Sequence, residues 1–151
     1  MKTLVGNLIE LAEQGEFEVI IHGCNCFCTM GAGIAKQIKI RFPEAYQADL
    51  KTLKGDKSKL GKISWAEVQT PNGKLIIANA YTQFDWRGKG NKADYDAIRQ
   101  AFRKVKEQFL GKLIGYPAIG AGLAGGDWNI ISKIIDAELQ GENHTFVKFN
   151  Q

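Results

Sequence analysis

The sequence predicts an α/β fold, because strand-like and helix-like spacings of apolar residues alternate from one end of the chain to the other. Residues 17–21, Phe-Glu-Val-Ile-Ile, form a short apolar run rich in β-branched side chains, as in a strand that is buried on both faces. Residues 31–42 instead repeat apolar side chains at helical spacing, and Pro43 follows where a helix has to end. A strand, a glycine-containing loop and a helix therefore follow one another, and the same order recurs later in the chain.

The remaining elements are predicted in order along the chain. Residues 62–68 and 75–80 predict the two strands of a hairpin, because Asn72-Gly73 between them is a strong turn signal. Residues 93–110 predict a helix with an apolar stripe typical of a core face, formed by Ile98, Ala101, Phe102, Val105 and Phe109. The elements expected after it are a strand over 112–117, a loop over 118–127, a helix over 128–139 and a last strand over 144–149.

Length and composition are those of one ordinary globular domain. We expect a single domain over residues 1–151, with a hydrophobic share of 44% and a charged share of 24% close to the average. No run of roughly 18 apolar residues predicts a membrane span, so we expect a cytoplasmic protein with no membrane partner, and a monomer by default. The net charge of +4 would attract anions, but its densest part, 87–106, fits a solvated helix face as well as a nucleic-acid patch.

Two glycine-rich loops carry the clearest chemical signal. The first, residues 22–34, reads His-Gly-Cys-Asn-Cys-Phe-Cys-Thr-Met-Gly-Ala-Gly-Ile, and the second, residues 119–127, holds four glycines in nine residues. Glycine between a strand and a helix lets backbone N–H groups approach an anion, and the helix N-terminus adds a partial positive charge. Both loops would line the crevice at the carboxyl ends of the strands, which predicts a diphosphate ligand. The dinucleotide and P-loop fingerprints are absent, which disfavours a Rossmann dehydrogenase or a kinase.

Three stretches of the chain resemble the macrodomain family. They are Gly6-Asn7-Leu8, the loop 22–34 with its Asn25, and Pro117-Ala118-Ile119-Gly120-Ala121-Gly122 followed by Gly125-Gly126-Asp127-Trp128. The resemblance covers nearly the whole chain, and it implies a three-layer α/β/α fold with a mixed central sheet. It also implies a small-molecule ligand, ADP-ribose or ADP-ribose-1″-phosphate, and it leaves protein-linked or nucleic-acid-linked ADP-ribose open.

The resemblance also implies which residues meet the ligand. Asn7 and Leu8 would contact the adenine, although Asn7 replaces the family's usual aspartate and so lacks its negative charge. Asn25 would bond the distal ribose. Independently of the resemblance, Phe149 on the predicted last strand could flank the adenine. The expected ligand-binding residues are Asn7, Leu8, Cys24, Gly31, Ala32, Gly33, Ile34, Tyr81, Ile119, Gly120, Ala121, Gly122, Leu123 and Ala124.

The activity expected from the resemblance is removal of the 1″-phosphate from ADP-ribose-1″-phosphate. Hydrolase members of the family use a lysine where this chain has Gln83, and an acidic residue where it has Ala124, which argues against their lysine-dependent mechanism. The phosphatase branch resembles this chain at His22, so the expected catalytic residues are His22 for proton transfer, Asn25 as ribose anchor and Asp127 to orient water. Each has a structural alternative: His22 as a hydrogen-bonded histidine at a strand end, and Asp127 as the N-cap of the following helix.

Two other functions remain open at this point. One is hydrolysis of ADP-ribose esters on protein or nucleic acid by water attack, and the other is a non-catalytic module that binds ADP-ribose. The aromatic residues near the predicted cleft, Tyr81, Phe84 and Trp86, suit either stacking on a ligand or covering the core. Arg87 and Lys89 could meet a terminal phosphate or a nucleic-acid backbone.

Three cysteines, Cys24, Cys26 and Cys28, stand at alternate positions of the first loop. Neighbours on one strand face do not bridge easily, so no disulfide framework is expected. The spacing also lacks the paired ligands that zinc requires, and His144 is the only histidine besides His22, so we expect no metal and no cofactor. A thiolate nucleophile at Cys24 or Cys26 is the remaining alternative.

Overall fold

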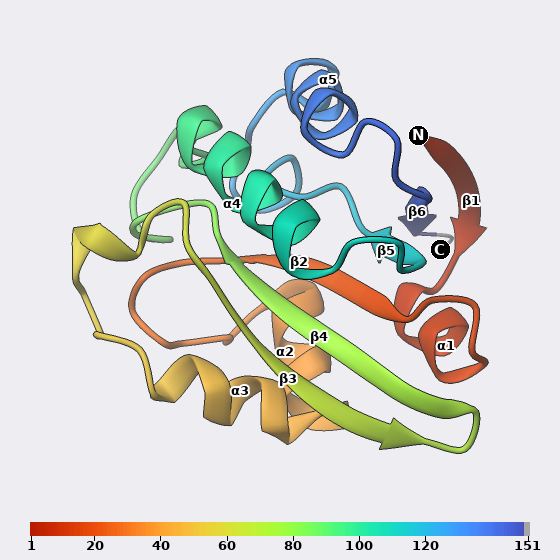
Figure 1. Ribbon diagram of the computed structural model, residues 1–151. Helices are drawn as coiled ribbons and strands as arrows, with labels where there is room; N and C mark the ends of the chain where they lie inside the picture. Colours follow the sequence, from red (N-terminus) through yellow and green to blue (C-terminus); the bar gives the residue numbers. More distant parts are fainter. Residues whose placement is uncertain (150–151) are drawn as a thin grey trace.

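A six-stranded mixed sheet runs through the computed structural model, which describes residues 1–149 (Figure 1). The strand order is β1-β6-β5-β2-β4-β3, and every neighbouring pair is parallel except β3 and β4, which form the predicted antiparallel hairpin. The strands are β1 (Lys2–Gly6), β2 (Val19–Cys24), β3 (Ile63–Thr70), β4 (Gly73–Tyr81), β5 (Ile114–Tyr116) and β6 (His144–Phe149).

Helices cover both faces of this sheet, which confirms the three-layer α/β/α prediction (Figure 1). Helices α4 and α5 lie on one face, and α1, α2 and α3 lie on the other. The helices are α1 (Leu8–Glu13), α2 (Gly33–Arg41), α3 (Pro43–Leu50), α4 (Tyr95–Gln108) and α5 (Trp128–Glu138), with a short 3₁₀ turn at Lys57–Lys59. Within residues 1–149, none of these helices has the length and apolar character needed to cross a membrane.

The predicted apolar stripe of α4 forms the core of one face. All five of its residues are buried, and they pack against Ile131, Ile134 and Ile135 of α5 and against the sheet. Burial of this many aliphatic and aromatic side chains is the main favourable term that holds α4 and α5 on the sheet.

Strand β2 extends three residues further than the sequence indicates. It does not stop before His22-Gly23, because His22, Gly23 and Cys24 continue the parallel pairing with Asn79, Ala80 and Tyr81 of β4. The long partner strand therefore sets the length of β2. As a result His22 lies inside the sheet and not at the mouth of the first loop.

Three elements were not predicted from the sequence: β1, α1 and α3. Pro43 ends α2, as expected, but it also begins α3, since proline fits the first position of a helix, where no intrahelical N–H bond is needed. Helix α3 has a direct bearing on the candidate site, because its Asp49 reaches the cleft described next.

Candidate binding cleft

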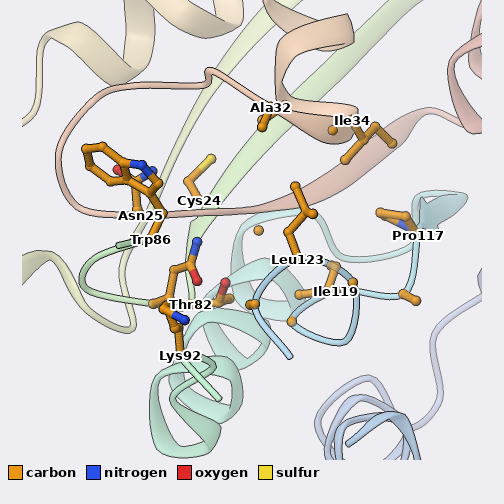
Figure 2. Close-up of a pocket in the computed structure, with 18 of the residues that line it drawn as sticks. Cys24, Asn25, Ala32, Ile34, Thr82, Trp86, Lys92, Pro117, Ile119 and Leu123 are labelled. Carbon is orange, nitrogen blue, oxygen red and sulfur yellow. The ribbon is translucent and has the colours of Figure 1, made fainter. Parts of the chain in front are cut away.

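A cleft of about 750 Å³ opens at the carboxyl ends of β2, β4, β5 and β6. The start of α2 forms one wall, and the second glycine-rich loop faces it, with Ala32 and Ile34 opposite Leu123 and Ile119 (Figure 2). The segment that follows β4 closes one end, and the end of β6 lines the other. The two loops therefore share one cleft, as the sequence predicts.

The N-terminus of α2 is open toward this cleft. Its N-cap residue, Ala32, makes no side-chain hydrogen bond, and the first turn carries no acidic residue. The first N–H groups of a helix have no partner within the helix, and together they carry a partial positive charge. The wall at Ala32 and Gly33 is therefore suited to a phosphate group.

The first loop reaches this position through unusual backbone conformations. Two non-glycine residues, Cys28 and Met30, have positive φ angles of 57° and 39°, and Gly33 has a φ of 58°. Residues other than glycine rarely adopt positive φ angles, because their side chains crowd the backbone there. Residues with such strained backbones concentrate at functional sites. The Asn25 side chain stabilises the same loop, since its Oδ1 accepts from the Phe27 backbone N–H at 2.8 Å and its Nδ2 donates to Thr29 Oγ1 at 2.7 Å.

The second loop is held by its own backbone. Gly126 N donates to Gly120 O at 2.7 Å, and Gly125 N donates to Gly122 O at 3.1 Å. A Cβ at Gly126 would lie 2.6 Å from Gly120 O, so only glycine fits there. Gly122 differs, because a Cβ at that position would meet nothing within 4 Å and would point into free space beside the cleft.

Eleven of the predicted site residues line this cleft. They are Cys24, Asn25, Gly31, Ala32, Gly33, Ile34, Ile119, Gly120, Gly122, Leu123 and Ala124. The structure does not bring six others to it, and these are Asn7, Leu8, His22, Tyr81, Ala121 and Asp127. Ala121 belongs to the second loop, where its N–H donates to Ala118 O at 3.1 Å.

Asn7 and Leu8 have structural positions away from the cleft. The Asn7 side chain caps α1 by accepting from the Glu10 backbone N–H at 3.1 Å. Leu8 is 3% exposed and packs in the core beneath α1 and α2. In the structure the Asn7 side chain therefore caps α1 and the Leu8 side chain belongs to the core, and their contact with the adenine stays a prediction.

His22 is completely buried within β2 and does not line the cleft. Its Nε2 lies 2.7 Å from Asn79 Oδ1, and Asn79 in turn donates to Ala45 O and Ser64 Oγ, both at 3.0 Å. Burial lowers the pKa of His22 to about 4, so the ring is neutral near neutral pH. The predicted proton-transfer role therefore needs correction, and the geometry is that of a hydrogen-bonded structural histidine.

Tyr81 is also buried, and it meets a carboxylate that sequence reasoning missed. Its hydroxyl donates to Asp49 Oδ1 at 2.7 Å and lies 2.8 Å from Ser64 Oγ. Asp49 comes from the unpredicted helix α3 and lies at the floor of the cleft. Burial raises the pKa of Asp49, while the Tyr81 hydroxyl and the nearby Lys59 oppose that shift.

All three cysteines are free and buried. Cys24 lines the cleft, but burial and the charge of Asp49 raise the pKa of its thiol well above the usual value. Burial also raises the pKa of Cys26 to about 11. Because the thiolate is the nucleophilic form, neither residue suits nucleophilic catalysis. Residues 1–149 hold no group of three or more metal-ligating side chains.

Asp127 is the N-cap of α5, which confirms the structural alternative for this residue. Its side chain accepts from the Asn129 backbone N–H at 2.9 Å, and its own N–H donates to the Tyr95 hydroxyl at 3.1 Å. The carboxylate is thus directed to the helix and not to the cleft.

The end of the cleft after β4 holds polar side chains that the sequence indicates only weakly. Thr82, Gln83, Trp86 and Lys92 all line the cleft, as does Asn25 of the first loop (Figure 2). Gln83 Oε1 is buried and has no hydrogen-bond partner among residues 1–149. The sequence marks Lys92 only as one member of a charged loop, and no local pattern indicates that this lysine faces the second glycine-rich loop.

Comparison with known proteins identifies a family and a similar phage protein. The family model described as Macro domain matches residues 21–135. An uncharacterized 17.5 kDa protein in the tk-vs intergenic region of Enterobacteria phage T4 is 38% identical over 141 residues, which are 90% of this chain and 88% of that protein.

More distant similarities point in the same direction. A DNA ADP-ribosyl glycohydrolase of Mycobacterium tuberculosis is 28% identical over 128 residues, or 84% of this chain, but the match spans only 36% of that longer protein. The structure of Thermosipho africanus DarTG in complex with ADP-ribose superposes with a TM-score of 0.72 at 17% identity. That match covers 99% of this chain and 42% of the other, and it is a similarity of fold.

Proposed function

Since the chain belongs to the Macro domain family, we propose that its cleft binds ADP-ribose, with the diphosphate between the two glycine-rich loops. One observation carries this proposal: the uncapped N-terminus of α2 faces Gly122 and Leu123 across a cleft of about 750 Å³. The backbone N–H groups of α2 supply donors for one phosphate, and the open side of Gly122 leaves room for the other. Cleft volumes of roughly this size are typical of small-molecule sites.

The two ends of the cleft differ in a way that sets the direction of the ligand. The β6 end is lined by Phe146 and by Phe149, whose side chain is 60% exposed, and Pro117 lies on the same side of the cleft. An adenine ring can stack on such a surface. The opposite end carries the polar side chains of Asn25, Thr82 and Gln83, which suit the hydroxyl groups of the distal ribose.

The reaction we propose at this end is removal of the phosphate from ADP-ribose-1″-phosphate. Gln83 stands where hydrolase members of the family use a lysine, and an amide cannot attack C1″, which favours attack by water on phosphorus. A bond forms between the water oxygen and phosphorus while the bond between phosphorus and the C1″ oxygen breaks. A proton from the water passes to the C1″ oxygen, which leaves as the hydroxyl of ADP-ribose, and inorganic phosphate is released. Backbone N–H groups and the Lys92 ammonium can stabilise the charge that develops on the phosphate oxygens. His22 takes no part in this scheme, because β2 buries it completely.

A second candidate reaction is release of ADP-ribose from DNA. The observation in its favour is the similarity to the mycobacterial DNA ADP-ribosyl glycohydrolase over 84% of this chain. Exposed Trp86 and Arg87 beside the cleft would be available to a nucleic-acid strand. Gln83 in place of the lysine argues against this reaction running by the lysine-dependent route.

Three assays on one preparation test these proposals. Calorimetric titration with ADP-ribose tests binding, phosphate release from ADP-ribose-1″-phosphate tests the phosphatase, and ADP-ribose release from ADP-ribosylated DNA tests the second candidate. Saturable binding with phosphate release supports the leading proposal, and DNA-linked turnover without phosphate release replaces it. Binding without either turnover makes the chain a binding module, and absence of binding overturns the proposed function.

A further inference from the structure

We propose that Gln83 and Lys92 together determine specificity for the group attached to the distal ribose. Gln83 Oε1 accepts a hydrogen bond from a ribose hydroxyl, and Lys92 Nζ binds an anionic substituent at C1″. This inference rests on the proposed function, since it needs ADP-ribose to lie in the cleft with its distal ribose near Thr82.

The first support is the unsatisfied oxygen of Gln83. Its backbone is fixed at the end of β4, where Gln83 N donates to Cys24 O at 3.4 Å and Cys26 Sγ donates to Gln83 O at 3.6 Å. Its side chain lines the cleft, yet in the part of the chain that the structure describes no group donates to the buried Oε1. Leaving a buried acceptor unpaired costs about 1–3 kcal/mol, so a ligand hydroxyl that supplies the missing donor binds favourably.

The second support is the position of Lys92. Its backbone N–H donates to Ala124 O at 2.7 Å, and Asp94 N donates to Thr82 O at 2.9 Å. These two bonds tie the segment 92–94 to the second glycine-rich loop and to the end of β4. The half-buried side chain lines the cleft, and Figure 2 shows it at the same end as Thr82.

The ammonium group of Lys92 has hydrogen-bond donors left for a ligand. Nζ donates to Gly90 O at 3.0 Å, which uses one of its three protons and holds the side chain in place. A positioned lysine with free donors is a suitable partner for a phosphate, to which it offers a point charge.

The other charged groups near the cleft are placed differently. Arg87 forms a bidentate pair with the Asp85 carboxylate, with bonds of 2.8 and 3.0 Å. Lys148 lies on β6, which β5 and β2 separate from β4. Among the charged side chains that line the described cleft, Lys92 is therefore the cation at the ribose end, and Asp49 is hydrogen-bonded to Tyr81.

The experiment compares three ligands with wild type and four variants, by calorimetric titration for ADP and ADP-ribose and, for ADP-ribose-1″-phosphate, by its KM in phosphate release or by titration where no phosphate is released. The ligands are ADP, ADP-ribose and ADP-ribose-1″-phosphate, which differ first by the distal ribose and then by its phosphate. The variants are Lys92→Met, Lys92→Arg, Gln83→Leu and, as a matched control, Lys89→Met. Lys89 is exposed on the same loop and does not line the cleft, so its removal lowers the net charge equally.

We expect Lys92→Met to weaken 1″-phosphate binding about tenfold more than ADP-ribose binding, as for loss of one charge-assisted bond. Lys92→Arg restores part of the preference, and Lys89→Met has no differential effect. Gln83→Leu weakens the binding of ADP-ribose several-fold more than the binding of ADP. Equal losses for all ligands, or the same result for Lys89→Met as for Lys92→Met, overturn this inference while the proposed function stands. Failure of wild type to bind ADP-ribose overturns the proposed function and this inference together.

Discussion

The two strand–loop–helix units of this protein look equivalent in sequence, but they differ in the backbone N–H groups that they leave available to a ligand. The first loop leads into α2, whose N-cap Ala32 makes no side-chain hydrogen bond, so the helix N–H groups stay open to the cleft. The second leads into α5, whose first turn is already capped by the Asp127 carboxylate. An anion can use the helix terminus in the first unit, but in the second it depends on the glycine-rich backbone before the helix. A strand–glycine–helix motif therefore offers the helix terminus itself to an anion only when the helix lacks its own cap; otherwise only the backbone of the glycine-rich loop is available.

The strands that lead into the two loops differ as well. Strand β2 buries His22 against Asn79, with both side chains completely inaccessible to solvent. Strand β5 has only three residues and ends in Tyr116, whose hydroxyl lies 2.6 Å from His144 Nδ1 of β6. Each strand thus directs one polar side chain, that of His22 or Tyr116, to a neighbouring strand and away from the cleft.

The largest effect is expected from closing the second loop. Gly122→Glu adds a charged side chain where a Cβ would meet no described atom within 4 Å, so we expect the fold to be unaffected while the proposed diphosphate position becomes obstructed and negative. We expect ADP-ribose affinity to fall by about a hundredfold or more, from exclusion and like-charge repulsion. The melting temperature should stay within about 2 °C of wild type. Gln69→Glu, an exposed change of equal charge on β3, is the control and should bind normally.

The next largest effect concerns the strand before the first loop. His22 has its folded-state pKa lowered from 6.5 to about 4, so the unfolded chain binds a proton that the folded chain excludes. The stability that the folded protein gains from a neutral His22 is fully present above pH 6.5, and the free energy of unfolding falls as the pH falls toward 4. Between pH 7.5 and pH 4 we expect the free energy of unfolding of the wild type to fall by about 3 kcal/mol more than that of His22→Asn, as measured by urea unfolding. His144 and Asp49 titrate in both proteins and cancel in this difference. Parallel pH profiles would show that His22 is not a buried neutral group.

An intermediate effect is expected from making the first unit resemble the second. Ala32→Asp places a capping carboxylate at an N-cap whose φ of −149° and ψ of 161° are already extended. We expect unfolding to require about 0.5–1 kcal/mol more, and ADP-ribose to bind about tenfold more weakly, because the carboxylate occupies the N–H groups and repels phosphate. Ala32→Ser caps without charge and should weaken binding less. Unchanged affinity in Ala32→Asp would show that α2 does not hold a phosphate.

The smallest effect on binding is expected from the reciprocal change. Asp127→Ala removes the cap of α5 and should cost about 1 kcal/mol of stability in thermal or denaturant unfolding. ADP-ribose affinity and phosphate release should stay within about twofold of wild type, because the carboxylate does not line the cleft. A large loss of turnover with normal stability would restore Asp127 to the water-orienting role and contradict its assignment as a cap.

The fold was predictable where the pattern is local. The α4 stripe, the hairpin turn at Asn72-Gly73 and the two glycine-rich loops all depend on residues close in sequence, and the structure confirms them. Strand β1 was missed because it lies at the sheet edge, where four of its five residues are exposed and no apolar alternation results. Helix α3 is not predicted from the sequence because Pro43, coming after a helical repeat, indicates the end of a helix as readily as the start of one.

The backbone loops of the candidate site could be predicted from the sequence, but the side chains that line it could not. Glycine spacing identified both loops, but the burial of His22 follows from pairing with β4, more than 50 residues away in the chain. Lys92 reaches the cleft through a bond to Ala124, and Asp49 arrives on a helix that was not foreseen. Side chains that depend on such long-range contacts carry no signal in local sequence patterns.

The most direct test of the central claim is a crystal structure of this protein with ADP-ribose. We predict that one phosphate accepts hydrogen bonds of about 2.7–3.2 Å from the backbone N–H groups at the start of α2, and that the other lies against the second loop beside Gly122. The distal ribose should lie toward Gln83 and Lys92. A diphosphate held by surface side chains outside the cleft, or lying away from the α2 terminus, would contradict the account.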